Sequence, residues 1–413
     1  MASCSRAAHG TSLLWEDLQF YRRARGGNHL HMRPGGRMIV SRLQRVIASV
    51  CVIALAPWLR GQVPLKKAFK QNFPVGVAVN DAQVAGYDKR GASIVQEEFN
   101  SISPENAMKW ESIHPFPGGY SFERADRYVA FGEANHMLIV GHTLVWHNQT
   151  PAWVFRDRTG ALVDRDTLLK RMRDHIQTVV SRYKGRIQSW DVVNEALDET
   201  GALRQSLWLQ IIGDDYIAKA FEYAHEADPA AQLTYNDYSL DTNEAKRAGA
   251  IALITKLKSQ GVPITAIGLQ CHVSLSSPTP QQEDATIAAF QKLGVKINIS
   301  ELDVDVLPRA TSSQTAEVSL SVRPEKRLNP YVNGLPAHVQ QALADRYADL
   351  FSVFTKHHDA IARVTFWGVT DADSWLNNWP IRGRTNYPTL FDRDGHPKPA
   401  FAAIEGAASE SSK

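Results

Sequence analysis

Two glutamates at the ends of apolar runs are the residues of this 413-residue sequence whose type and position best suit chemistry. Glu195 closes the run "SWDVVNE" (189–195), whose bulky residues suit a buried strand, and Glu301 closes the run "KINISE" (296–301). A carboxylate at the end of such a run is costly to bury unless it is paired or hydrogen-bonded. Two carboxylates that face one cleft are the groups that hydrolyse a glycosidic bond, one as the acid and one as the nucleophile or base.

The elements that must position these glutamates recur along the chain as short apolar runs separated by segments with helical spacing. The runs are 73–79, 99–103, 137–145, 189–193, 232–237, 264–271, 296–300 and 363–368, and the helical segments include 168–183, 208–227, 244–257, 286–293 and 339–354. Eight strand–helix units favour an α/β fold, a single (β/α)8 TIM barrel with a parallel eight-stranded core. The alternative is a doubly wound open sheet, but "GVAVNDAQ" (76–83) is not the Gly-rich phosphate turn typical of that fold.

Polar and aromatic residues follow the predicted strands, where the catalytic residues of such barrels lie. The set comprises Glu105, Asn106, Lys109, His142, Trp146, His147, Gln149, Trp153, Asn194, Glu195, Tyr235, Asn236, Asp237, Gln270, His272, Glu301, Asp303, Trp367, Trp375 and Trp379. Asn194 could hold a sugar 2-hydroxyl, and His272 and Asp303 could keep the nearby glutamate ionised. Aromatic walls with a few amides and carboxylates suit a sugar, which has apolar faces and hydroxyl edges.

Each residue of this set also has a simpler explanation when it is taken alone. An Asn-Glu pair at a strand end is often a capping pair, and His142 alone is more often a core histidine with its hydrogen bonds satisfied. Cys271 is interpreted as a small buried hydrophobe. The prediction therefore depends on the set as a whole.

Three other functions fit parts of the same set. A retaining glycosidase that acts on cellulose or another β-glycan would share both glutamates, and a sugar-binding barrel would have lost catalysis. A metal-dependent hydrolase or isomerase would use some of His142, His147, Glu195, His272, Glu301 and Asp303 as ligands. Their spacing forms no compact ligand motif, so neither a metal nor another cofactor is expected.

The first 61 residues differ from the rest of the chain in charge. They hold nine Arg and two acidic residues, a net charge of +7, which leaves −4 on the other 352 residues. A mildly acidic body gives no reason to expect a nucleic-acid partner. Arg42 and Arg45, followed by the eleven-residue, largely apolar segment 46–56, indicate a secretory signal peptide at 38–61. A first core helix is the alternative, and residues 1–37 are interpreted as an upstream extension outside the fold.

The remaining sequence predicts one domain, a barrel over residues 62–408 with a disordered tail at 409–413. A long polar loop at about 307–336, after the seventh predicted strand, is expected to pass over one barrel mouth. Cys271 is the only cysteine after residue 61, so the mature chain is expected to contain no internal disulfide. The export signal predicts a secreted or periplasmic protein with no membrane contact once the signal is removed.

Eight stretches of the body, taken in order, resemble glycoside hydrolase family 10, the endo-β-1,4-xylanases. They are "FNSISPENAMKWESIHP", "GHTLVWHNQTPAW", "WDVVNEALDE", "YNDY", "IGLQCHVS", "ISELDVDV", "FWGVTDADSWL" and "PKPAF". The resemblance extends from about Leu65 to Ala402, and no accessory binding module accompanies it. The loop at 307–336 is longer than the family's minimum and is expected to overhang the leaving-group side.

The resemblance implies a retaining xylanase with Glu195 as the general acid/base and Glu301 as the nucleophile, their carboxyl groups about 5–5.5 Å apart. It implies that Asn194, His272 and Asp303 support catalysis. It assigns substrate binding to Glu105, Asn106, Lys109, His142, Trp146, Gln149, Tyr238, Gln270, Trp367 and Trp375, with the first three and Gln149 on the non-reducing side. The expected partners are xylan and xylo-oligosaccharides, with a monomeric enzyme.

Overall fold

The structure, a computed structural model, describes residues 63–311 and 315–410. The predicted upstream extension (1–37) and signal peptide (38–61) lie outside the described residues. None of the helices in the described part of the chain combines the length and the apolar character needed to cross a membrane.

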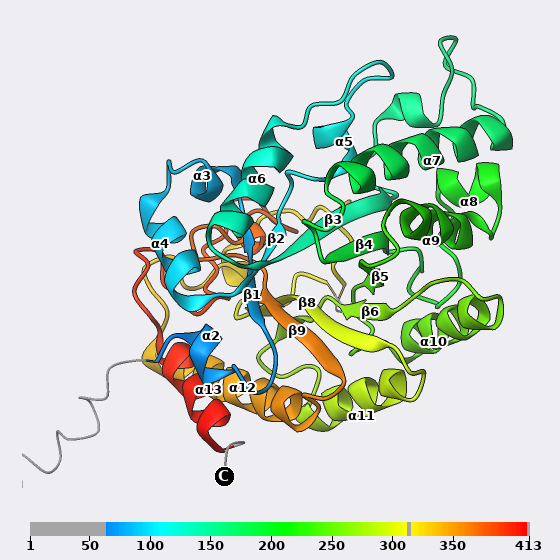
Figure 1. Cartoon of the computed structure of the whole chain (residues 1–413). Coiled ribbons are helices and arrows are strands. Elements are labelled where there is room, and N and C mark those ends of the chain that lie inside the picture. The colour runs from blue at the N-terminus through cyan, green and yellow to red at the C-terminus, as the bar shows by residue number, and fades with distance from the viewer. Residues whose placement is uncertain (1–62, 312–314, 411–413) are drawn as a thin grey trace, which may run out of the picture. The chain divides into compact units, whose positions relative to one another are not determined.

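Eight parallel strands form a closed barrel, which confirms the predicted fold. In barrel order they are β1 (Val75–Val79), β2 (Ser101–Pro104), β3 (Leu138–Trp146), β4 (Ser189–Asn194), β5 (Gln232–Asp237), β6 (Ala266–Leu269), β8 (Lys296–Asp305) and β9 (Ile361–Phe366). Pairing of β6 with β8 and of β9 with β1 closes the ring, and Figure 1 shows β1 in blue beside β9 in orange. The short β7 (His272–Ser274) pairs with the C-terminal end of β8, so the chain after β6 stays beside the residues that follow Glu301.

Helices surround this barrel (Figure 1). The long ones are α4 (Lys89–Glu98), α6 (Glu123–Ala134), α7 (Arg165–Arg182), α9 (Tyr216–Ala227), α10 (Glu244–Ser259), α11 (Pro280–Gln291), α12 (Ala337–Lys356) and α13 (Pro399–Glu410). Short helices lie at α2 (Leu65–Ala68), α3 (Asp81–Val84), α5 (Trp110–Ile113) and α8 (Leu207–Ile212), with 3-10 turns at Ala152–Val154, Lys326–Leu328 and Trp375–Asn377.

Two helices differ from the sequence prediction. The segment predicted as one helix over 208–227 is split into α8 and α9 because Gly213 ends α8 with a φ of 100°. Helix α11 begins six residues before the predicted position 286, where Thr279 and Gln282 form a reciprocal capping box. A polar first turn carries no apolar spacing, so periodicity alone does not detect it.

The barrel strands are buried on both faces, and polar side chains inside the barrel pair with one another. Asn298 donates to the Thr234 hydroxyl over 3.1 Å, and Arg363 donates to the Ser189 hydroxyl over 3.0 Å. Outside the strands, α12 buries Tyr347, Leu350 and other apolar residues of its inner face. The barrel interior is therefore filled by side chains, and residues at the strand ends are the ones that can face a ligand.

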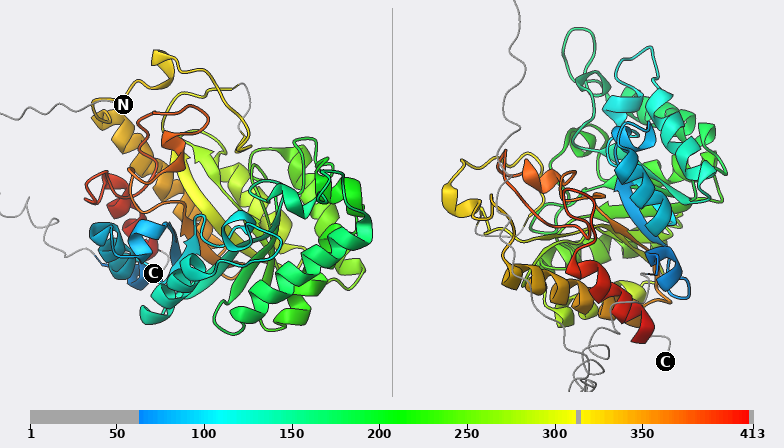
Figure 2. Two further views of the ribbon diagram at one scale, coloured as in Figure 1. Left: turned by 90° about the horizontal axis from the view of Figure 1, so that it is seen from above. Right: turned by 90° about the vertical axis from the view of Figure 1, so that its left-hand side faces the viewer.

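The loop between β8 and α12 is the predicted excursion, and Figure 2 shows its yellow trace with little helix. Its residues 306–311 and 315–336 are described, and they include one 3-10 turn. At the other end of the chain α13 continues to Glu410, two residues beyond the predicted end of the barrel domain. The rest of the predicted tail, 411–413, lies outside the described residues.

Candidate active site

A cavity of about 190 Å³ lies at the C-terminal ends of the barrel strands. It is lined by Glu105, Asn106, Lys109, His142, Trp146, Gln149, Asn194, Glu195, Gln270, His272, Glu301, Ala316, Val318, Trp367 and Trp375. Of the residues to which the family resemblance assigns a catalytic, supporting or binding role, all except Asp303 and Tyr238 border this space. The parallel barrel accounts for this convergence, because every strand delivers its C-terminal end to the same mouth.

Glu195 is buried and held by three side-chain donors. The Trp146 indole donates to Oε2 over 2.8 Å, and the Gln270 and Asn194 amides donate to Oε1 over 3.1 and 3.2 Å. Its backbone amide donates to the carbonyl of Asn236 over 2.8 Å and so fixes the residue against β5. The carboxylate is thus fixed in position before any substrate arrives.

The surroundings of Glu195 favour the protonated form. Burial raises the pKa of the carboxyl group above its ordinary value, and the charges of Asp237 and Glu301 add to this effect against the opposing charge of His147. A carboxyl group whose surroundings favour the protonated form can act as a general acid.

Glu301 is equally buried, but its partners differ. The Asn236 amide donates to Oε1 over 2.7 Å, and His272 Nε2 lies 3.3 Å from Oε2. The same Asn236 amide donates to Asn194 Oδ1 over 2.8 Å, and Asn236 Oδ1 accepts from the Ser300 hydroxyl over 2.6 Å. The amides of Asn194 and Asn236 therefore connect the two glutamates.

The surroundings of Glu301 favour the ionised form. Burial alone would raise the pKa of this carboxyl group, but the hydrogen bond from His272 and the charges of His142 and His272 lower it below its ordinary value. Burial opposes the charge of His272 itself, yet Asp303 and Glu301 raise the imidazole pKa to about 10. His272 Nδ1 lies 3.1 Å from Asp303 Oδ1, and the Trp375 indole donates to Asp303 Oδ2 over 2.8 Å. The imidazole is therefore a cation that supports an anionic Glu301.

One wall of the cavity carries the residues that follow β2 and β3. The Lys109 ammonium donates to Asn106 Oδ1 over 3.0 Å and lies 5.0 Å from the centroid of the Trp146 ring. Gln149 donates to Glu111 over 2.8 Å and lies within 3.4 Å of the same Asn106 oxygen. Burial raises the pKa of Glu105 and lowers that of Lys109. This wall offers both donors and acceptors to the hydroxyl groups of a ligand.

Beneath the cavity His142 is fixed by residues inside the barrel. Its Nδ1 lies 3.0 Å from Asp191 Oδ2, and Arg363 lies 3.6 Å from the other oxygen of that carboxylate. The Trp367 ring meets the His142 ring edge to face at 5.4 Å. A histidine oriented in this way presents a defined ring edge to the cavity.

Two aromatic residues lie elsewhere than the sequence suggested. Tyr238, predicted to contact substrate, is buried behind the cavity wall, where its hydroxyl accepts from Arg204 over 2.8 Å and its ring packs under Lys246. That prediction is corrected, because the side chain is enclosed by these partners and does not border the cavity. Trp153 donates to the Pro115 carbonyl and packs against Arg171, so it is also not part of the lining.

The sequence analysis gave no role to several residues that complete the site. Asn236 was noted at a strand end, but its link between the two glutamates depends on side-chain directions that a sequence does not contain. Ala316 and Val318 come from the long loop, which has no periodic pattern to place it. Asp191 lies inside an apolar run, and only the barrel shows that it faces His142.

Two groups of potential metal ligands are found among residues 63–311 and 315–410. Asp241, Cys271 and Glu283 form a buried group, and Asp392, Asp394 and His396 form a mostly exposed one. Neither group contains a residue that lines the cavity.

A known family and a known protein match this sequence. The family described as Glycosyl hydrolase family 10 matches residues 64–407. The protein "Endo-1,4-beta-xylanase A" of Xylanibacter ruminicola is 42% identical over 363 residues, which cover 88% of this chain and 98% of that protein.

Solved structures show the same similarity. A GH10 endoxylanase retrieved from a sugarcane soil metagenome has a TM-score of 0.81 and 45% identity, covering 83% of this chain and 99% of its own. The intracellular xylanase TsXylA of Thermoanaerobacterium saccharolyticum, solved as a mutant with xylotetraose, has a TM-score of 0.73 and 39% identity over 83% and 98% of the two chains. The resemblance seen in the sequence is thus confirmed, and the chain belongs to glycosyl hydrolase family 10.

Proposed function

We propose that this protein is an endo-1,4-β-xylanase that cleaves internal bonds of xylan with retention of configuration. One observation carries the proposal. Two buried carboxylates are joined through Asn194 and Asn236, and their surroundings favour a proton on Glu195 and a charge on Glu301. Retaining glycosidases need this pairing of an acid with a nucleophile.

In the first step the Glu301 carboxylate attacks the anomeric carbon and forms a glycosyl ester. Glu195 gives its proton to the departing glycosidic oxygen, so the leaving sugar departs as an alcohol. In the second step the Glu195 carboxylate takes a proton from water, and the water oxygen attacks the anomeric carbon and frees Glu301. His272 stays positively charged throughout and stabilises the nucleophile in each free state.

Xylan is the proposed substrate because of the cavity lining and the relatives' names. Indole rings of Trp146, Trp367 and Trp375 border the same cavity as both glutamates and suit the apolar faces of sugar rings. "Endo-1,4-beta-xylanase A" and the xylotetraose complex of TsXylA describe proteins that act on or bind β-1,4-linked xylose chains. We therefore propose xylan and xylo-oligosaccharides as the ligands.

The test measures reducing-sugar release from arabinoxylan and from soluble cellulose, with EDTA present. Wild type should release short xylo-oligosaccharides from arabinoxylan and little sugar from cellulose. Glu301→Ala should lower the rate of release from arabinoxylan at least about 10³-fold. Glu226→Gln is the matched control. Glu226 lies on α9, forms a surface ion pair with Arg173 of α7 and is not part of the cavity lining. Equal rates on both polymers would contradict the substrate, and an active Glu301→Ala would contradict the site.

We also propose that the enzyme is exported through residues 38–61 and acts as a monomer outside the cytoplasm. The largely apolar segment 46–56 directly follows Arg42 and Arg45 in the sequence, and this arrangement supports export. Fractionation of a cell that expresses the full chain, with N-terminal sequencing of the exported product, tests this. Recovery of an uncut chain from the cytoplasm would contradict it.

A further inference from the structure

A small hairpin after β4 brings Arg204 back to the main chain of Glu195. The Arg204 amide donates to the Ala196 carbonyl over 2.8 Å, and Leu197 pairs with Leu203. Gly201 at the tip lies against α10 so closely that an added Cβ would be 2.3 Å from the Ala245 carbonyl oxygen. The hairpin is thus fixed at its tip and its base, and it holds Arg204 in one place.

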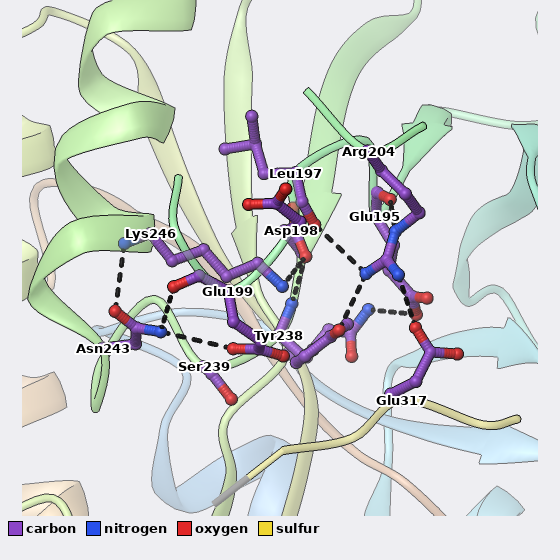
Figure 3. Close-up of polar contacts among 12 residues, drawn as sticks. Glu195, Leu197, Asp198, Glu199, Arg204, Tyr238, Ser239, Asn243, Lys246 and Glu317 are labelled. Atoms are coloured by element: carbon purple, nitrogen blue, oxygen red, sulfur yellow. Dashed lines mark hydrogen bonds and ion pairs between the residues drawn. The ribbon is translucent and has the colours of Figure 1, made fainter. Parts of the chain in front are cut away.

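The Arg204 guanidinium has four partners, which Figure 3 shows around it. It donates to the carbonyls of Glu195 and Leu197, each over 3.1 Å, and to the Tyr238 hydroxyl over 2.8 Å. Its remaining edge forms a 2.5 Å ion pair with Glu317, a residue of the long loop. A lysine could not satisfy these partners together, because it lacks the planar fork of donors.

Glu195 needs support from its main chain, because it has a φ of 57°. This left-handed conformation is unfavourable for a non-glycine residue and persists only where neighbours fix it. The amide of Glu195 is held by Asn236, and its carbonyl is held by Arg204. Arg204 thus helps to set the direction in which the carboxyl group points.

Glu317 fixes the part of the loop that borders the cavity. Besides Arg204, its carboxylate accepts from the Ser319 amide over 3.2 Å, and its carbonyl accepts from the Trp379 indole over 3.1 Å. Two residues earlier, the Thr315 hydroxyl donates to Glu199 of the hairpin over 3.1 Å. The neighbours Ala316 and Val318 line the cavity, and the Val318 side chain remains 38% exposed.

We propose that Arg204 is a positioning residue for Glu195 and that its ion pair with Glu317 holds residues 315–318 as the wall for the sugars on the leaving-group side. This inference rests on the proposed function. The acid must lie at the junction between the reacting and the leaving sugar. The segment contacts the hairpin that directly follows Glu195, the acid that protonates the leaving oxygen, so it flanks the leaving sugars. Val318 offers them an apolar face.

The wall is tested with Glu317→Ala, and Glu226→Gln is the control that also breaks an arginine ion pair. Values of kcat/KM are measured on xylohexaose, which places sugars on both sides of the cut, and on 4-nitrophenyl β-xylobioside, which places none on the leaving side. The loss of kcat/KM in Glu317→Ala should be about tenfold larger on xylohexaose than on the aryl substrate. This difference should come from a higher KM on xylohexaose. An equal loss on both substrates, or a result like the control, would overturn the wall.

The positioning role is tested with Arg204→Lys and Arg204→Ala on phenyl and 4-nitrophenyl β-xylobioside. These substrates have similar shapes, but phenolate is the poorer leaving group and needs the proton of Glu195 more. In both variants kcat/KM should fall about tenfold more on the phenyl than on the 4-nitrophenyl substrate. A general loss of stability would lower both values equally. Arg204→Lys keeps the charge and so serves if Arg204→Ala does not fold. A wild-type ratio between the two substrates in Arg204→Lys would overturn the role.

The ion pair of Arg204 with Glu317 is the proposed anchor of residues 315–318. Inactivity of the wild type on xylohexaose would contradict the proposed function and would leave this anchor to be tested separately. Amide hydrogen exchange then decides the anchor without any substrate. Glu317→Ala should expose residues 315–322 and 195–204 to faster exchange, whereas Glu226→Gln should not. Unchanged exchange in Glu317→Ala would refute the anchor.

Discussion

At the scale of single residues, the neighbours of two glutamates shift the pKa values of their carboxyl groups in opposite directions. Glu195 receives neutral donors and lies near other carboxylates, whereas Glu301 faces a histidine cation held by Asp303. The difference is therefore a property of the surroundings and not of the glutamate itself.

The pH dependence of kcat/KM should be bell-shaped. Activity should rise with pH through the lowered pKa of Glu301, below about 4.5, and fall as Glu195 loses its proton at a pKa above about 4.5. His272→Gln removes the cation, so the pKa of Glu301 should rise and the acidic limb should move to higher pH. The exposed His396→Gln is the control. An acidic limb that stays in place in His272→Gln would show that the imidazole does not set it.

Glu195→Gln should stabilise the fold at neutral pH while it lowers activity on xylan by about 10²–10⁴-fold. The folded pKa of Glu195 is raised, so its contribution to stability is complete below its unfolded value of 4.5 and is lost as the pH rises through the folded value. Gln mimics the protonated form at every pH. The Tm difference between variant and wild type should therefore grow from pH 4 to pH 8, and a constant difference would contradict the raised pKa.

The sequence identified both glutamates, because a charged residue at the end of an apolar run stands out. It did not place Tyr238 correctly, since the residue after a strand can point into the cavity or behind it. Arg204 carried no signal at all, because its role depends on a hairpin that returns it to Glu195.

At the scale of elements, the pairing of β5 with β6 holds the asparagine that donates to Glu301. Asn236 and Gly268 are paired across the two strands, and an added Cβ at Gly268 would lie 2.1 Å from Asn236 Oδ1. A glycine is therefore required where the asparagine side chain crosses the neighbouring strand.

Gly268→Ala should displace Asn236 and break its 2.7 Å hydrogen bond to Glu301. We expect kcat/KM to fall at least about tenfold and the free energy of unfolding to fall by about 1–3 kcal/mol. Activity on xylan and urea unfolding measure the two effects. Gly118→Ala is the control, because an added Cβ there meets no atom within 4 Å. Wild-type activity in Gly268→Ala would show that Asn236 is not needed at its observed position.

The strands were predictable because a parallel strand buried on both faces is apolar along its length. The largely apolar run 137–145, for example, covers β3 except for its last residue, Trp146. Helix limits were less predictable, because the glycine that ends α8 lies within continuous apolar spacing. The segment 315–318 was not predictable as a wall, since its position comes from partners on the hairpin and from Trp379.

At the scale of the whole molecule, the residues from Gln62 onward form one compact unit that contains every residue of the site. A chain that begins at Gln62 should therefore keep the kcat/KM of the full chain and unfold in one cooperative transition. Calorimetry and activity on xylan, with and without EDTA, measure this. A lower Tm in the shorter chain would show that the first 61 residues contribute to the fold, and loss of activity in EDTA would contradict metal-independent catalysis.

The count of eight strand–helix units was enough to predict the closed barrel, because few folds repeat that unit eight times. Charge separated the basic first 61 residues from the acidic body but could not show where the chain is cut.

The most direct test of the central claim is to trap the covalent intermediate with an activated 2-fluoro xylobioside and to map the labelled peptide by mass spectrometry. The fluorine slows both steps, and the good leaving group lets the first step proceed, so the sugar should accumulate as an ester. One label per chain is expected on Glu301, with a loss of activity that is reversed as the ester hydrolyses. A label on Glu195, or no label with an inverted first product, would contradict the central claim.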